Sequence, residues 1–225
     1  MDIISNLLIS EARIPYHTAI MILSFPIIST MIAIFRYYFG FKTFGLYPHI
    51  ILIYALYSFS IISDFGLDFF RGFKLSMLFL LVAILSVSAS KILFAQINFH
   101  IVPKKNLYLT IGLISILFVF LFAKEYDKRS ILEVQFLGIL AILTLSEKYL
   151  NFSIKKGQRS AFWYMFNTIT VSTLLSFLIT SNLFQQILLG NTWIILVAII
   201  INIIVGSYTG LRISELIRFR KISNE

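Results

Sequence analysis

The sequence contains no cysteine, which excludes disulfide bonds, thiolate nucleophiles and cysteine-ligated metal ions. Its three histidines, His17, His49 and His100, are scattered and form no His-Glu-x-x-His pair, so a zinc protease site is not supported. No Gly-x-Ser-x-Gly nucleophile elbow is present. The segment Gly40–Thr43 lacks the glycine that precedes the lysine in a phosphate-binding loop. We therefore expect no catalytic residue, no metal ion and no cofactor, and the sequence disfavours an enzyme.

Charged residues are also scarce, at 13% of the chain against about 25% in ordinary soluble domains. Hydrophobic residues make up 59%, where about 45–50% is usual. A soluble domain of this size cannot bury such an excess, because it still needs a polar exterior. A lipid bilayer can accommodate it, at about 20 residues for each helix that crosses. We predict an all-α fold, a polytopic membrane helix bundle that forms a single domain over residues 1–225.

Seven apolar runs divide the chain, and each predicts a transmembrane helix. The predicted spans are residues 16–35, 44–63, 75–95, 107–123, 131–146, 161–179 and 193–208, followed by a basic tail at 211–225. The first run could instead be a cleaved signal peptide, but Glu11 and Arg13 precede it and no small-residue cleavage site follows. The fifth run is short and contains Glu133 and Gln135, which favours a tilted helix or one inside the bundle. A short interfacial helix is predicted at Leu183–Leu189.

Lysine and arginine are unevenly divided between the two sides of these predicted spans. One side carries 12 of the 19, and these are Arg36, Lys42, Lys104, Lys105, Lys148, Lys155, Lys156, Arg159, Arg212, Arg218, Arg220 and Lys221. Because cytoplasmic loops are richer in basic residues, we expect the N-terminus outside the cytoplasm and the C-terminus inside it. This orientation also accounts for the net charge of +9, so nucleic acid is not expected as a partner.

Polar side chains within the predicted spans are candidates for function, because ionisable groups at membrane depth are costly. The intramembrane candidates are Lys91, Glu133, Asn167 and Asn202. Lys91 lies about four residues from the end of its span, where its long stem could instead carry the ammonium to the interface. Glu147 ends the fifth span and opens a predicted basic loop that runs to Arg159. There it is either solvated or paired with a nearby arginine.

Two segments on the predicted cytoplasmic side combine aromatic residues, arginine and glycine. Phe35–Gly45 links the first two spans, and Gly206–Arg220 follows the last. Aromatic and cationic side chains anchor helix ends at lipid headgroups, and glycines permit close helix approach. In the second segment Arg212, Glu215 and Arg218 follow at i, i+3 spacing, which indicates a helix along the cytoplasmic surface.

Each of these segments contains a motif. The motif residues are Arg36, Gly40, Thr43, Phe44, Gly45 and Pro48 in the first, and Tyr208, Thr209, Gly210, Arg212, Glu215, Arg218 and Arg220 in the second. Together they resemble the bacterial seven-transmembrane domain that is usually fused to an inactive transglutaminase-like domain. The resemblance covers essentially the whole chain, including the Glu147 loop, and the second motif is its most specific part. Family members usually carry the transglutaminase-like domain before the first span, whereas 15 residues precede the predicted span here.

The resemblance implies partners rather than a catalytic site. The family resembles a partner of ATP-grasp peptide ligases and of a retropepsin-like protease. The chain is also similar to the small membrane subunit of poly-γ-glutamate capsule synthases. The resemblance implies a multi-pass protein of the bacterial cytoplasmic (inner) membrane, with a transglutaminase-like chain as a further partner.

The leading hypothesis is therefore a non-enzymatic integral membrane subunit. It would scaffold or couple a cytoplasmic ATP-grasp-type peptide ligase and could pass an anionic peptide product outward. The alternative is a small-solute transporter or channel, which would need the intramembrane polar groups to converge on a cavity. The oligomeric state is left open.

Overall fold

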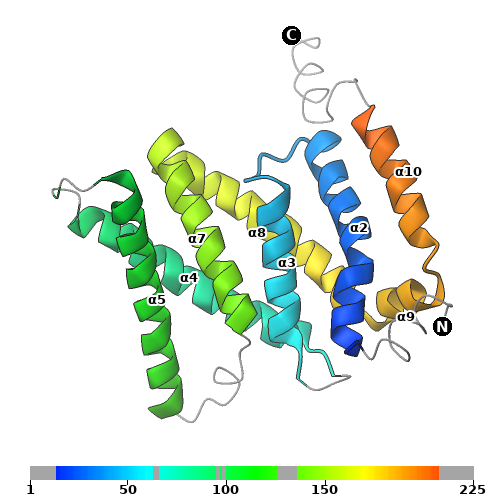
Figure 1. Cartoon of the computed structure of the whole chain (residues 1–225), viewed down its shortest axis with the longest axis horizontal. Helices are drawn as coiled ribbons and strands as arrows, with labels where there is room; N and C mark the ends of the chain where they lie inside the picture. The colour runs from blue at the N-terminus through cyan, green and yellow to red at the C-terminus, as the bar shows by residue number, and fades with distance from the viewer. Residues whose placement is uncertain (1–13, 63–65, 95–96, 98–99, 126–135, 208–225) are drawn as a thin grey trace, which may run out of the picture.

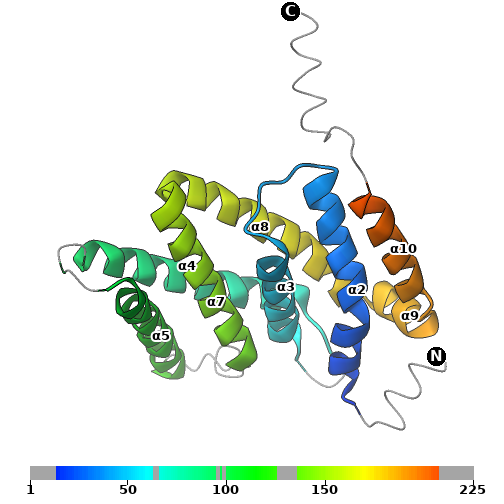
Figure 2. The same cartoon turned by 45° about the horizontal axis from the view of Figure 1, so that its top comes forward.

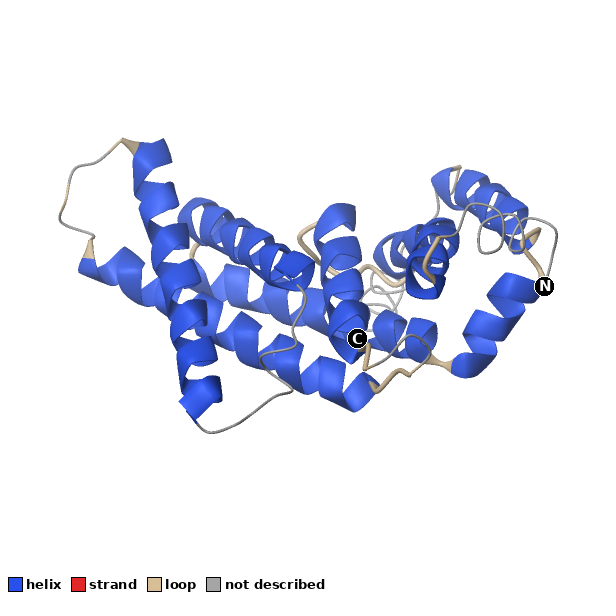
Figure 3. Cartoon of the chain, turned by 60° about the horizontal axis from the view of Figure 1, so that its bottom comes forward, coloured by secondary structure: helices blue, strands red, loops and turns tan. Residues whose placement is uncertain are grey.

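The computed structural model is all-α in the part of the chain that it describes, which is residues 14–62, 66–94, 97, 100–125 and 136–207 (Figure 3). Its helices are α2 (Tyr16–Tyr37), α3 (Leu46–Ser60), α4 (Phe69–Leu93), α5 (Ile101–Glu125), α7 (Phe136–Lys156), α8 (Gln158–Thr180), α9 (Asn182–Gly190) and α10 (Ile194–Gly206). An isolated antiparallel bridge pairs Ile61 with Leu67 in the connection between α3 and α4.

The helices α5, α7, α3, α2 and α10 stand side by side in that order, and α4 and α8 lie obliquely across one face of this row (Figures 1 and 2). Successive long helices reverse direction, so the connections gather at two opposite ends of the bundle. The Arg36 end is where α2, α4, α7 and α10 finish and where α3, α5 and α8 begin. The Asp68 end is where α3, α5 and α8 finish and where α2, α4, α7 and α10 begin.

The short helix α3 occupies the centre of the bundle. It packs against α2, α4, α7 and α8, and 11 of its 15 residues are buried. At 1.5 Å per residue it is about 22 Å long, shorter than a hydrocarbon core of about 30 Å. Enclosure on all sides explains why its sequence is apolar around the whole helix rather than along one face.

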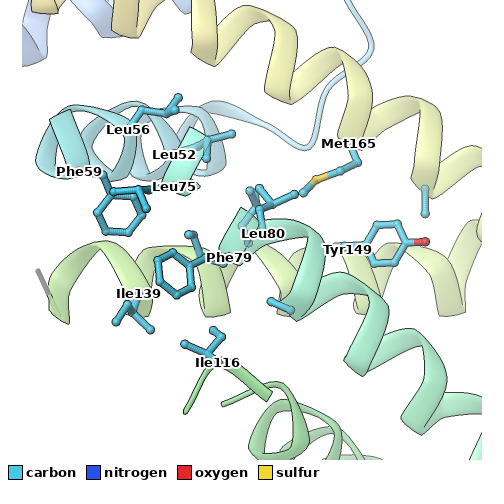
Figure 4. Packing of buried hydrophobic residues seen from close by; sticks show 14 residues of the cluster. Leu52, Leu56, Phe59, Leu75, Phe79, Leu80, Ile116, Ile139, Tyr149 and Met165 are labelled. Atoms are coloured by element: carbon cyan, nitrogen blue, oxygen red, sulfur yellow. The ribbon is translucent and has the colours of Figure 1, made fainter. Parts of the chain in front are cut away.

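Two clusters of buried apolar side chains hold the bundle together. In the first, Phe79 of α4 contacts a layer contributed by α3, α5 and α7, as the labelled side chains in Figure 4 show. The second joins α2, α3, α8 and α9 around Ile20, Tyr57 and Leu188. Since α3 contributes to both clusters, it connects the two halves of the row.

Many large apolar side chains remain exposed on the outside of the bundle. On α10, for example, Leu196, Ile203 and Ile204 are each more than half exposed. In the described part, α2, α4, α5 and α8 are long and apolar enough to cross a membrane. The pair α9 and α10, which meet at 98°, makes a fifth candidate if it counts as one broken span. The chain thus has the features of a membrane-embedded helical protein with four or five such helices, and the predicted number of seven is not confirmed.

The largest departure from the predicted spans concerns α7. The predicted basic loop from Glu147 to Arg159 is wrong, because every described residue there except Gly157 is helical. Buried residues continue along α7 at helical spacing, and they are Ile142, Leu145, Ser146, Tyr149, Leu150 and Ser153. The predicted start of this span, including Glu133, lies outside the described residues. The short helix predicted at Leu183–Leu189 is confirmed as α9.

Candidate functional site

Basic side chains gather at the Arg36 end of the bundle. Within the described part the helix boundaries place nine there, namely Arg36, Lys42, Lys91, Lys104, Lys105, Lys148, Lys155, Lys156 and Arg159. The only carboxylate in the described part of this half is that of Glu147. At the Asp68 end, the described residues comprise three cations, Arg71, Lys74 and Lys124, and two acids, Asp68 and Glu125. Counted over the described residues, the Arg36 end is therefore strongly positive, while the Asp68 end is close to balanced.

The connection between α2 and α3 carries the first motif and is fastened to α8. The side-chain amide of Asn167 donates to the carbonyl of Lys42 at 3.1 Å, and the backbone N–H of Phe44 donates to Thr168 Oγ1 at 3.3 Å. The Phe44 ring also packs against Tyr164, with centroids 6.2 Å apart. Two separate helical turns of α8 thus hold this connection over the Arg36 end.

The motif glycines have a backbone role. Gly40 has a φ of 76° and Gly45 a φ of 120°, in the region that side chains with a Cβ rarely adopt. A Cβ on Gly45 would lie 3.9 Å from Nη1 of Arg36, which places the guanidinium beside this turn. Arg36 is exposed and lines a pocket of about 280 Å³ together with Asn202 of α10. The motif therefore presents a cation at the surface, in the last turn of α2 and beside a connection that requires glycine.

The first turn of α3 contributes the remaining motif residue and a histidine. Pro48 is buried there, in a helix turn that tolerates proline. Next to it, His49 is 1% exposed, and its Nδ1 lies 3.0 Å from Oγ of Ser172 on α8. Thr43 is buried as well, and its hydroxyl has no hydrogen-bond partner among the described residues.

Sequence reasoning missed the contact between His49 and Ser172. The residues are 123 positions apart, so no local motif reveals the pair. One signal was available: α8 carries small hydroxyl residues at i, i+4 spacing along its buried face, at Thr168, Ser172 and Ser176. That stripe marks the face of α8 that lies against α3.

The structure places the intramembrane polar candidates in three separate contacts. Lys91 donates from Nζ to Oγ of Ser153 at 3.2 Å, between α4 and α7. Asn167 donates to the carbonyl of Lys42 in the connection before α3. Asn202 donates to Oγ1 of Thr30 at 2.7 Å, between α10 and α2. These three therefore do not converge, and Glu133 lies outside the described residues.

Glu147 accepts a hydrogen bond from the side-chain amide of Asn151, one turn further along α7, at 3.2 Å. It also lines a pocket of about 290 Å³ between α5 and α7. The pairing with a nearby arginine considered from the sequence is not seen among the described residues. All seven residues of the second motif, from Tyr208 to Arg220, lie outside the described part.

A larger pocket, of about 580 Å³, lies between α2, α3 and α7. Its lining is mostly apolar, with polar atoms from His17, Tyr54, Ser58 and Thr144. The hydroxyl of Tyr54 donates to the carbonyl of Met21 at 2.8 Å, so it joins α3 to α2. Lys91, Asn167 and Asn202, the three intramembrane candidates within the described residues, do not line this pocket.

Among the described residues, no group of three histidine, aspartate or glutamate side chains could hold a metal ion. Comparisons with protein-family models, with curated proteins and with solved structures find no match to this chain.

Proposed function

We propose that this chain is a non-enzymatic integral membrane subunit whose Arg36 end docks an acidic partner on the cytoplasmic side. The observation that carries the proposal is the charge distribution: nine of the described cations lie at one end of the bundle, against one carboxylate. A surface of one sign attracts and orients partners of the opposite sign. The Arg36 end therefore suits an acidic protein surface or an anionic peptide.

The partner that we propose is an ATP-grasp-type peptide ligase, with its anionic peptide product passing outward along the complex. This choice rests on the resemblance of the Arg36–Pro48 and Gly206–Arg220 motifs. The first of these motifs lies at the Arg36 end, where such a ligase would bind. A transglutaminase-like chain or a retropepsin-like protease is a further partner of the same assembly.

We propose seven spans in the bacterial inner membrane, with the N-terminus outside and the C-terminus in the cytoplasm. Two features support this number beyond the helices that are long and apolar enough. Apart from α9, successive helices run in alternating directions, so α3 and α7 also run from one end of the bundle to the other (Figure 1). In addition, α3 is enclosed by α2, α4, α7 and α8, so it does not need to match the bilayer thickness by itself.

Orientation can be tested with single cysteines, since the chain has none of its own. Lys74→Cys places a thiol on an exposed residue near the Asp68 end, and Lys155→Cys places one on an exposed residue at the Arg36 end. In intact cells a membrane-impermeant maleimide should label Lys74→Cys, while Lys155→Cys should react after permeabilisation. The reverse pattern would place the Arg36 end outside and contradict docking of a cytoplasmic ligase.

Docking can be tested by affinity purification of the full chain from its native membranes at low salt. The variant Lys155→Gln/Arg159→Gln removes two exposed cations at the Arg36 end, and Lys74→Gln/Lys124→Gln removes the same charge at the Asp68 end. We expect the first variant to lose the ligase and the control to retain it. Equal recovery with both variants, or no ligase with the unaltered protein, would contradict the proposal.

The alternative function, a small-solute transporter or channel, now rests on the pocket of about 580 Å³ alone, because Lys91, Asn167 and Asn202 do not converge on one cavity. Transport requires that pocket to contain water. In Thr144→Cys the thiol would line it, whereas in Leu117→Cys the thiol would lie on the exposed outer face of α5. Rapid reaction of Thr144→Cys with a charged thiol reagent, beside an unreactive Leu117→Cys, would favour the transporter over the docking subunit.

A further inference from the structure

Lys91 is a membrane-domain cation that lacks an anionic partner in the described structure. It lies in the last turn of α4, is partly buried, and donates to the neutral hydroxyl of Ser153. No described carboxylate lies within 4.0 Å of its ammonium group. A charge removed from water is costly unless an opposite charge accompanies it. An anion bound beside Lys91 would supply this missing opposite charge.

A pocket of about 260 Å³ opens at this position between α4, α7 and α8. Polar groups on all three helices line it: Ser88 and Lys91 on α4, Tyr149 and Ser153 on α7, and Gln158 on α8. These groups offer one ammonium, three hydroxyls and one amide, which are suited to several oxygens on a single negatively charged centre. A phosphate group has this chemistry.

The start of α8 adds to the positive character of the pocket. Gln158 is the first residue of α8, and the preceding Gly157 supplies no side-chain cap. The N–H groups of the first helical turn have no partners within the helix, and the helix dipole favours negative charge beside them. Lys91 and the α8 N-terminus thus favour the same ligand from two elements of the fold.

The rim of the pocket is suited to a phosphate that is carried by a lipid. Ile92 lines it and is 74% exposed, and the adjacent Leu93 is 75% exposed. Both lie at the end of α4, one of the helices long and apolar enough to cross a membrane. Lys91 is two residues from that end, and the end of a membrane-crossing helix lies near the lipid headgroups. Exposed apolar side chains there can contact acyl chains while the polar pocket receives the headgroup.

We propose that the pocket around Lys91 binds the phosphate of an anionic phospholipid. Basic pockets between transmembrane helices are established binding sites for such headgroups. Lys91 is one of the nine cations at the Arg36 end, but the lipid site does not rest on the docking function, because it requires no protein partner and the other eight cations lie outside this pocket.

The experiment uses the purified full-length protein in neutral detergent. Native mass spectrometry would measure its affinity for phosphatidylglycerol and for phosphatidylcholine with the same acyl chains. We expect phosphatidylglycerol to bind more tightly, and Lys91→Gln to lower that affinity by about tenfold, as expected for the loss of one charged hydrogen bond. Lys91→Arg should keep most of the affinity. The matched control Lys74→Gln, an exposed cation on the same helix, should leave it unchanged.

Ser88→Leu would partly fill the pocket without removing charge, so it should also weaken phosphatidylglycerol binding if Lys91→Gln fails to fold. Equal affinity of Lys91→Gln and the unaltered protein, or an equal loss in Lys74→Gln, would overturn the proposal. Displacement of the lipid by millimolar inorganic phosphate would assign the pocket to a free phosphate instead. Displacement by oligoglutamate, dependent on Lys91, would assign it to an acidic peptide and would equally overturn the lipid site.

Discussion

The two ends of the bundle use charged and polar groups in different ways. At the Asp68 end these groups serve the local fold: the carboxylate of Asp68 accepts from the backbone N–H groups of Phe70 and Arg71 at 2.9 and 3.3 Å and so caps α4. Arg71 in turn donates to the carbonyl of Ile61 at 3.4 Å. At the Arg36 end, by contrast, nine cations accompany a single carboxylate among the described residues, and Arg36, Lys42 and Arg159 are exposed.

The difference fits the proposal that the Arg36 end binds a partner, while the capping of α4 and the close approach of Gly72 to α3 show close packing at the Asp68 end. Lys156, at the Arg36 end, has no carboxylate partner among the described residues. Its ammonium group lies over the rings of Phe152 and Tyr164, 5.2 and 5.8 Å from their centroids. Such cation–π contacts stabilise a cation without cancelling its charge. The positive charge of Lys156 therefore still adds to that of the Arg36 end.

The largest effect is expected at the Asp68 end, from Gly72→Ala. A Cβ at Gly72 would lie 2.6 Å from the carbonyl oxygen of Leu56 and 2.8 Å from the backbone nitrogen of Ser60. Because backbone atoms cannot rotate away, α4 must shift from α3, and we expect a loss of about 3 kcal/mol in the free energy of unfolding. Thermal unfolding in detergent, followed by circular dichroism, measures it.

The control for this substitution is Gly190→Ala, where a Cβ meets no atom within 4 Å. It should change stability by less than about 1 kcal/mol, the range of helix propensity. Similar losses in the two variants would show that the close contact at Gly72 does not determine how much stability the Asp68 end contributes.

The sequence allowed the fold class and most helices to be predicted, because long apolar runs separated by polar residues are a strong pattern. The predicted loop from Glu147 to Arg159 failed for a physical reason. Averaged hydropathy falls where Glu147, Lys148 and Lys155 occur, yet Tyr149 and Ser153 continue the buried face of α7. Periodicity indicates a helix there, whereas average hydropathy indicates a loop.

The candidate site could be predicted in part. The first motif was predicted to lie between two helices, and it does lie between α2 and α3, because its glycines and arginine are local features of sequence; its role as a site stays a prediction. Its fastening to α8 could not be predicted, because Asn167 and Lys42 are 125 residues apart. The separation of Lys91, Asn167 and Asn202 into different contacts likewise depends on how the helices pack, which no single segment encodes.

A smaller effect is expected at the Arg36 end, from Gly45→Ala. Its φ of 120° is strained for any residue with a Cβ, while the nearest atom, Arg36 Nη1, lies at an ordinary contact distance of 3.9 Å. We therefore expect a loss of about 2 kcal/mol, from backbone strain rather than from a clash. The same thermal measurement checks it. A loss as large as that of Gly72→Ala would show that the conformation of this connection matters as much to stability as the close contact of α4 with α3.

The smallest effect is expected from Asn167→Ala, which removes the donor to the carbonyl of Lys42. One partly exposed hydrogen bond contributes about 1 kcal/mol, so the bundle should remain folded. The matched control is Thr170→Ala on the same helix, whose hydroxyl donates within α8 to the carbonyl of Phe166. If the connection before α3 is a docking element, Asn167→Ala should increase proteolytic cleavage near Lys42 and reduce recovery of the partner, while Thr170→Ala should do neither. Unchanged cleavage and recovery would show that the position of this connection does not depend on its hydrogen bond to α8. The comparison between the Asp68 end and the Arg36 end would then rest on their difference in charge alone.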